Sequence, residues 1–342
     1  MTIVSRPYFA PHWRAFAVFL CMSAVLLGAR VSTAQDVGTR YALLVGGLGG
    51  NPTYTDQFGT YLGETRALLV DRYGMPGGQV HVLGENAIVD RSFVDDVSSS
   101  DNIRSYFDRL SGQVTPDDHV YVILFGHGSY DGTRTQLNIP RRDLDDEDFG
   151  ALLDGLDAGR IIFINTASAS GPFVQTLSAP DRIVITATAT GTQRDETVFP
   201  RYFIEALRSV DADFDKSGGL SVLEVFRYAS GEAARAFEAA GQLATEHALL
   251  EDSGDGEGVR HDEIDGSSEG ALASITFLRP PDVLANIDEA DRSLLRERET
   301  LQRSIAGLKS RKSEMDDDAY YAELESLLVQ LAQLNERLEG GP

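Results

Sequence analysis

The chain has very little cysteine and tryptophan: one of each in 342 residues, and both lie within the first 34. Cys21 is embedded in an apolar run, so a chain that loses this leader has no thiol at all. Disulfides, cysteine-ligated zinc and a cysteine nucleophile are then excluded together.

Basic residues are also scarce, with 30 Lys and Arg against 53 Asp and Glu and a net charge of −23. The first 34 residues contain three arginines and no acidic residue, so their removal takes the net charge to −26. A nucleic-acid partner is disfavoured, because a phosphate backbone needs a basic surface. Calcium, basic peptides or simple solubility would account for so much carboxylate.

Long apolar runs are absent apart from residues 15–29 (AFAVFLCMSAVLLGA). Arg6 and Arg14 precede this run, and the small residues Ser32-Thr33-Ala34 follow it, as in a secretory signal peptide. Fifteen residues are fewer than the roughly twenty that a spanning helix needs, although an uncleaved anchor is the alternative. We expect a signal peptide over 1–34, cleavage after Ala34, and a periplasmic or secreted protein with no membrane attachment afterwards.

Short apolar runs alternate with amphipathic segments over residues 35–281. This alternation predicts an α/β domain with a mainly parallel sheet sandwiched by helices. In such sheets function collects just past the carboxyl ends of the strands. The expected strands are 41–45, 79–83, 119–125, 160–164 and 182–187, and the expected helices are 57–73, 102–110, 143–156 and 196–210.

The composition changes in the last segment, residues 282–342. Apolar residues recur there at helical spacing on both sides of a polar break at 312–318: Ile287, Leu294, Leu301, Ile305 and Leu308, then Leu324, Leu327, Leu331, Leu334 and Leu338. This pattern predicts a C-terminal helical hairpin. Its helices either pack on each other or on the domain, or form a coiled coil for self-association.

Two polar residues follow strands of the predicted sheet that are consecutive in the sequence. His127 lies in Phe125-Gly126-His127-Gly128, and Ser168 lies in the small-residue loop after the next strand. If the strands are adjacent, a histidine beside a hydroxyl forms a minimal base and nucleophile pair. The backbone N–H of Gly128 is a candidate oxyanion donor. A simple turn beside a loop of small residues would give the same pattern.

An apolar strand ending in His-Gly, followed by one ending in Ala-Cys-x-Ser-Gly, is the signature of the caspase, legumain and gingipain group of cysteine peptidases. The chain resembles this group over residues 40–230, most closely legumain, with Ala167-Ser168-Ala169-Ser170-Gly171 in the nucleophile position. The stretch 117–128 is similar to the family's Asp-Asp-His-(apolar)-His-Gly segment. The resemblance implies a caspase-like fold and peptide or protein substrates.

The chain departs from this family at the nucleophile, where Ser168 replaces cysteine. A serine hydroxyl is much less acidic than a thiol and needs an aligned base, usually held by a third group. Asp131 is the nearest candidate for that group in the sequence. Two hypotheses follow: a degenerate peptidase fold that binds peptide or protein, or an active serine endopeptidase that uses Ser168 and His127.

Residues 213–224 (DFDKSGGLSVLE) match the twelve-residue EF-hand calcium loop. Gly218 occupies the sixth position, where the chain must turn sharply, and Leu220 is the apolar plug. The expected Ca²⁺ ligands are Asp213, Asp215, Ser217, Gly219 through its carbonyl, Ser221 and Glu224. An acidic turn that caps the following helix is the alternative. A second acidic stretch, 252–258, lacks the closing carboxylate and is interpreted as a solvated loop.

Overall fold

The computed structural model of the protein describes residues 38–88, 91–279, 289–312 and 315–339. The predicted leader, its cleavage point and the predicted boundary at 281/282 lie outside these residues. Ile287 of the predicted hairpin also lies outside them, as does the side chain of Leu338.

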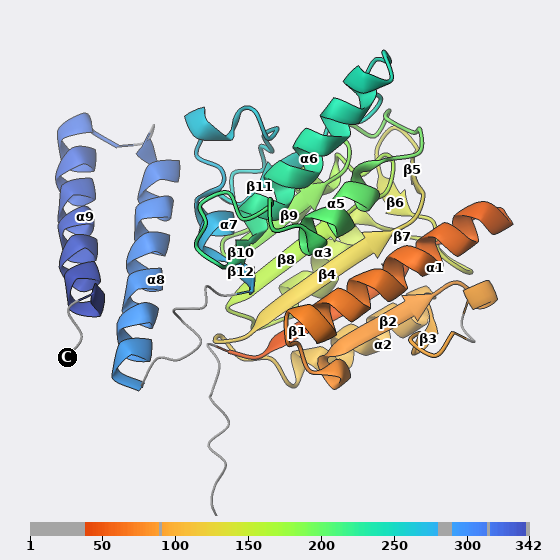
Figure 1. Ribbon diagram of the computed structural model, residues 1–342, viewed down its shortest axis with the longest axis horizontal. Coiled ribbons are helices and arrows are strands. Elements are labelled where there is room, and N and C mark those ends of the chain that lie inside the picture. Colours follow the sequence, from red (N-terminus) through yellow and green to blue (C-terminus); the bar gives the residue numbers. More distant parts are fainter. Residues whose placement is uncertain (1–37, 89–90, 280–288, 313–314, 340–342) are drawn as a thin grey trace, which may run out of the picture. The chain divides into compact units, whose positions relative to one another are not determined.

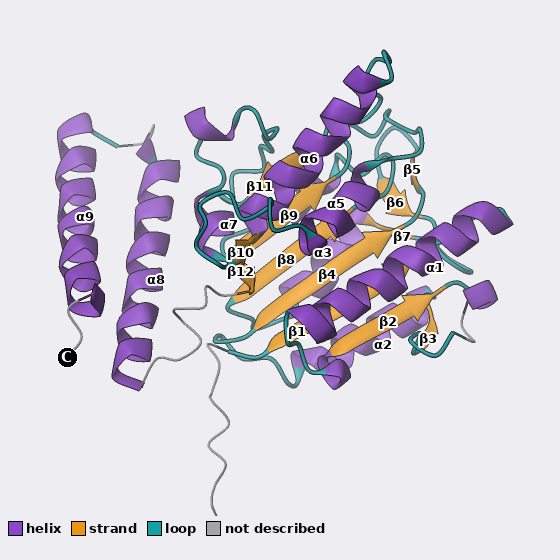
Figure 2. Ribbon diagram, in the orientation of Figure 1, coloured by secondary structure: helices purple, strands orange, loops and turns teal. Residues whose placement is uncertain are grey.

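The described residues contain a seven-stranded sheet with the order β11-β9-β8-β4-β1-β2-β3 (Figure 2). All neighbouring pairs are parallel except β11 and β9, which are antiparallel. The strands of this sheet are β1 (Arg40–Gly46), β2 (Val80–Gly84), β3 (Asp96–Val97), β4 (His119–Phe125), β8 (Arg160–Asn165), β9 (Arg182–Thr186) and β11 (Leu249–Glu251).

Helices cover both faces of the sheet, as Figure 1 shows. Side chains of α1, α5, α6 and α7 form one buried cluster with the sheet, and those of α2, α3 and α4 form the other. These helices are α1 (Pro52–Ala67), α2 (Ser100–Ser111), α3 (Asp146–Asp154), α4 (Phe173–Leu177), α5 (Phe199–Arg208), α6 (Val222–Ala239) and α7 (Ala271–Ile275). The predicted α/β fold class is confirmed.

The strand sequences explain this double burial. In β1, Ala42 and Leu44 face one cluster while Leu43 and Val45 face the other, because successive side chains point to opposite faces. All four are fully buried. A continuous apolar run is therefore what a parallel strand covered on both sides requires.

Several elements differ from the sequence expectation. Helix α1 begins at Pro52 rather than at 57, because the Asn51 side chain caps it by accepting from the Tyr54 N–H at 3.2 Å. A π-helical turn, Leu68–Arg72, continues it. Unexpected short strands form two small sheets: β5 (Gly128–Tyr130), β6 (Thr135–Leu137) and β7 (Leu144–Asp145), and β10 (Leu220–Ser221) with β12 (Phe277–Arg279). Single 3₁₀ turns cover Gly77–Gln79, Asn86–Ile88 and Ile264–Gly266.

The C-terminal segment contains two helices, α8 (Glu289–Ser310) and α9 (Asp317–Glu339), that pack against each other. Leu308 and Leu334, both on the predicted stripes, are almost fully buried. Arg337 Nη1 lies 3.9 Å from Glu297 Oε2, so the end of α9 lies beside the early part of α8. In the described residues the two helices thus form a hairpin, and Leu308 and Leu334 of the predicted stripes are buried in it.

Candidate functional site

His127 follows the carboxyl end of β4, where the sequence placed it, and its ring lies against α1. The ring packs edge-on against Tyr54 and Phe58, with centroids 4.6 and 5.1 Å away. Burial lowers the pKa of His127, while the charge of Glu196 and the backbone of Gly49 raise it. The net shift is downward, so burial in this aromatic wall favours the neutral imidazole.

Glu196 is the acidic residue whose charge raises the pKa of His127. The sequence analysis did not identify it. Both residues line a small depression with a cavity volume of about 10 Å³, roughly the space of one water. The carboxylate accepts from the Tyr54 hydroxyl at 2.9 Å and from Gln57 Nε2 at 3.3 Å. Its position past the end of β9 was the available signal, since that loop was expected to form part of the site.

Ser168 lies in the loop after β8, next to the strand that leads to His127, as predicted from strand adjacency. Its Oγ is 3.3 Å from both the backbone nitrogen and the backbone oxygen of Gly128. The residue is only 3% exposed. Among the described residues, no hydrogen bond joins this hydroxyl to the His127 ring. The predicted oxyanion donor, the Gly128 N–H, is thus directed at the Ser168 hydroxyl.

The backbone on either side of Ser168 is tightly held. Ala169 has a positive φ of 53°, an arrangement that costs a residue with a Cβ about 1–2 kcal/mol. Its N–H donates to the Gln193 carbonyl at 2.7 Å, and its carbonyl accepts from the Thr135 hydroxyl. Gly171 packs so closely on the loop after β9 that an added Cβ would lie 2.3 Å from Ala189 C. The loop that carries Ser168 is therefore tightly packed and enclosed.

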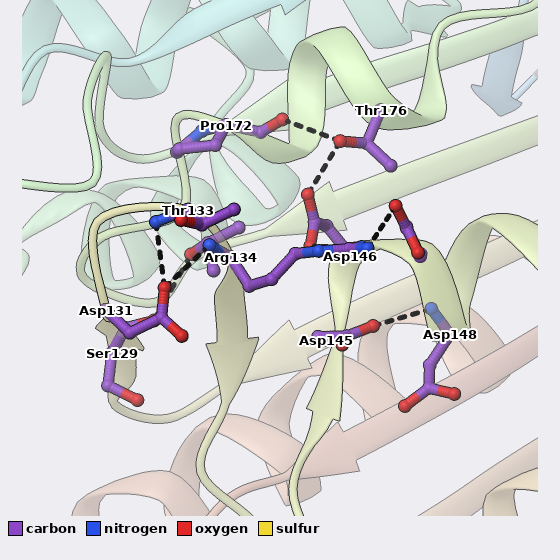
Figure 3. Close-up of polar contacts among 11 residues, drawn as sticks. Ser129, Asp131, Thr133, Arg134, Asp145, Asp146, Asp148, Pro172 and Thr176 are labelled. Carbon is purple, nitrogen blue, oxygen red and sulfur yellow. Dashed lines mark hydrogen bonds and ion pairs between the residues drawn. The ribbon is translucent and has the colours of Figure 1, made fainter.

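Asp131 does not orient His127. Its Oδ1 accepts the backbone N–H groups of Thr133 and Arg134, each at 2.8 Å, and thereby closes the turn between β5 and β6 (Figure 3). Arg134 in turn pairs with Glu147. This small sheet braces the loop after β4, and the role of third group considered for Asp131 is wrong.

Residues 213–221 lie between α5 and α6, and residues 222–224 form the first turn of α6, so the stretch connects two helices as in an EF-hand. Carboxylate oxygens of Asp213, Asp215 and Glu224 lie within 4.8 Å of one another. Gly218 has a φ of 78°, which explains the glycine at the sixth position. Glu224 supplies the closing carboxylate. Its oxygens accept from Phe214 N at 3.0 Å and from Ser221 N at 2.8 Å.

The remaining predicted ligands lie in the same loop but serve local turns. Ser217 Oγ accepts from Gly219 N at 3.2 Å. Ser221 caps α6 in a reciprocal capping box with Glu224. The helix-capping alternative is therefore confirmed. It does not exclude a metal ligand role for Glu224, because a carboxylate oxygen has more than one lone pair. Leu220, the predicted plug, is buried.

The interpretation of 252–258 as a solvated loop is wrong at its start. Asp252 is 7% exposed, and its two oxygens accept the N–H groups of Gly270 and Ala273, each at 2.7 Å. It caps α7 from a distant position in the sequence. Asp255, by contrast, is exposed as expected.

Comparison with known proteins does not assign the chain to a family. No protein-family model matches the chain, and no curated protein matches its sequence. Within the described ranges, the helices are too short or too polar to cross a lipid bilayer.

Proposed function

We propose that the protein is an exported, degenerate caspase/legumain-like domain that binds a peptide or protein beside His127 and does not cleave it. The observation that carries this proposal is the state of Ser168, whose hydroxyl is buried and bonded to the Gly128 backbone. A serine nucleophile needs a base that takes its proton. His127 is directed instead into the aromatic wall formed by Tyr54 and Phe58.

The surroundings of His127 indicate the chemistry of the ligand. The depression combines the aromatic rings of Phe58, Tyr61 and Phe125 with the exposed carboxylate of Glu196. Aromatic faces and a carboxylate both attract a Lys or Arg side chain. The acidic net charge of the chain favours the approach of a basic partner. A peptide with a basic residue is therefore the expected ligand.

A serine endopeptidase is the second candidate, because Glu196 supplies a carboxylate near the histidine. Its charge favours the protonated imidazolium, as the third member of a triad does. The strained φ of Ala169 is also the kind of feature that collects at functional sites. Catalytic hydrogen bonds often tighten only when substrate is bound. In this candidate His127 is the base and Ser168 the nucleophile.

Cleavage of a mixed peptide library separates the two candidates. The native protein is compared with Ser168→Ala and Ser168→Cys, with and without calcium. We expect no cleavage by the native protein and binding of basic peptides that Glu196→Gln weakens. Cleavage that Ser168→Ala abolishes would replace the binding proposal with the serine endopeptidase. Activity gained only in Ser168→Cys would identify a complete cleft that lacks its nucleophile.

Export is part of the proposal and rests on the leader sequence. If the leader is cleaved after Ala34, the protein recovered from outside the cytoplasm begins at Gln35. Mass spectrometry of its N-terminal peptide measures this directly. A chain that keeps Met1 and stays with the membrane fraction would instead support the uncleaved anchor.

We also propose that the loop 213–224 binds Ca²⁺. Support comes from the three clustered carboxylates and the left-handed glycine in the required position. Strand β10 of this loop pairs with β12, and the Tyr121 hydroxyl donates to the Phe277 carbonyl at 3.1 Å. Calcium there would brace α5 and α6 against the sheet.

A further inference from the structure

A buried carboxylate lies at the end of the edge strand β11. Glu251 is fully buried; its Oε1 accepts from the Gly254 N–H at 2.6 Å, and its Oε2 has no hydrogen-bond partner. The Ser178 hydroxyl is close enough to favour the charged form, but it is not placed to donate a hydrogen bond. An ionised carboxylate in this position costs several kcal/mol unless it takes up a proton or a cation compensates it.

Two further carboxylates converge on Glu251. Asp255 and Glu269 each bring an oxygen within 4.8 Å of it and of one another. Glu269 is buried, whereas Asp255 is exposed and closes the solvent side. In the described part of the chain, none of the three pairs with Lys, Arg or His. Three carboxyl groups therefore converge without a basic side chain beside them. A bound cation would take the place of protons there, because metal ligands must be deprotonated.

The cluster is fixed in place by backbone contacts. Glu269 Oε2 accepts the N–H of Asp252 at 2.5 Å, and Asp252 itself is occupied by the N–H groups that begin α7. Asp255 Oδ1 accepts the Glu257 N–H at 2.7 Å. Because these contacts already restrain the side chains, a cation would lose little affinity to ordering them.

We propose that Glu251, Asp255 and Glu269 form a second Ca²⁺ site, separate from the loop 213–224. The donors are hard carboxylate oxygens, which calcium and magnesium both accept. Two oxygens on opposite sides of a calcium ion, each about 2.3–2.6 Å from it, lie up to about 5 Å apart. Magnesium holds its ligands at about 2.0–2.1 Å in strict octahedra. The exposed side leaves room for the waters that complete a calcium shell.

This site would connect the edge of the sheet to the loop that carries Ser168. The segment after β11 packs on α4, the helix that follows Ser168. An added Cβ on Gly258 would lie 3.1 Å from Val174 Cγ1, and one on Gly254 would lie 3.4 Å from Ala179 C. An ion bound at Glu251 would therefore stiffen α4 and β11 together.

The test is a calcium titration of the purified protein, followed by calorimetry, after removal of metal with a chelator. Asp255→Asn is the main variant, because the residue is exposed and asparagine can keep the hydrogen bond to Glu257. Glu251→Gln is the second variant. Glu257→Gln is the matched control: it removes an exposed carboxylate of the same loop from outside the cluster.

We expect Asp255→Asn to weaken one class of bound calcium at least tenfold, and Glu251→Gln to abolish it. Glu257→Gln should bind like the native protein. Asp215→Asn, in the other loop, should leave this class unchanged, so failure of that loop is distinguishable from failure here. Unaltered binding in Asp255→Asn would overturn the proposal, as would magnesium binding with equal affinity.

Discussion

Ser168 and Gly128 hold each other across the carboxyl ends of β4 and β8, with Oγ of the serine 3.3 Å from both backbone polar atoms of the glycine. The contact requires a glycine, because an added Cβ at position 128 would lie 2.1 Å from the Ser168 carbonyl oxygen. This distance is far below a van der Waals contact, so the backbone at Ser168 or at position 128 would have to shift. The His-Gly pair therefore has a structural reason that is independent of catalysis.

Gly128→Ala should destabilise the protein by at least about 2 kcal/mol, since the two strand-end loops must move apart. Urea unfolding measures the change. Gly78→Ala is the control: no atom lies within 4 Å of its added Cβ, and its effect should stay within about 0.5 kcal/mol. Equal stability of the two variants would contradict the close packing of these loops.

Stability should fall as the pH rises from about 4.5 to about 7, because of Glu246. Burial raises the pKa of this carboxyl to about 7, although it accepts from Val198 N and Phe199 N at 2.7 and 2.9 Å. The folded state then binds more protons than the unfolded state in that range, so deprotonation disfavours folding. The contribution of Glu246 to this fall in the free energy of unfolding is at most on the order of 3 kcal/mol.

The difference in unfolding free energy between the native protein and Glu246→Gln isolates this effect. The variant should show a shallower fall with pH, because position 246 no longer titrates. Other carboxyl groups with a raised pKa, such as that of Glu269, affect the stability of both proteins equally. Their contributions therefore cancel in the difference. Parallel pH profiles would show that Glu246 keeps an ordinary pKa in the fold.

Calcium should raise the melting temperature through the loop 213–224. At a concentration one hundred times its dissociation constant, a bound ion adds about 2.7 kcal/mol to stability. Asp215→Asn removes one ligand charge and should reduce the calcium-dependent part of the shift. Lys216→Ala changes a neighbouring residue of the same loop without removing a ligand, and it should keep the calcium response of the native protein.

The sequence predicted the sheet and both strand-end residues because apolar runs such as β4 are local signals. The bounds of β4, His119–Phe125, are those expected from the run itself. The true role of Asp131 was not predictable in this way, and the only sequence signal for Glu196 was its position past the end of a strand. The loop that carries Glu196 is positioned by Glu246, about fifty residues further along the chain, and nothing in either segment alone indicates the contact.

The two carboxylate clusters also differ in how far the sequence predicts them. Residues 213–224 follow a fixed spacing along the chain, so the pattern predicts that Asp213, Asp215 and Glu224 cluster. Glu251 and Glu269 meet only because β11 joins the sheet edge and α7 packs beside it. Their sequence separation gives no periodic signal, and the segment between them was therefore interpreted as solvated.

Self-association through α9 is the last prediction. Tyr321, Leu328 and Val329 are about half exposed and form an apolar strip on this helix, while Leu334 is buried in the hairpin. Two copies that pair through this strip would bury it, as coiled-coil seams do. Leu328→Ser should weaken association in sedimentation experiments and leave the unfolding free energy of the monomer nearly unchanged. Leu334→Ala should instead destabilise the hairpin by about 2–5 kcal/mol. A native protein that sediments as a monomer at all concentrations would contradict the prediction.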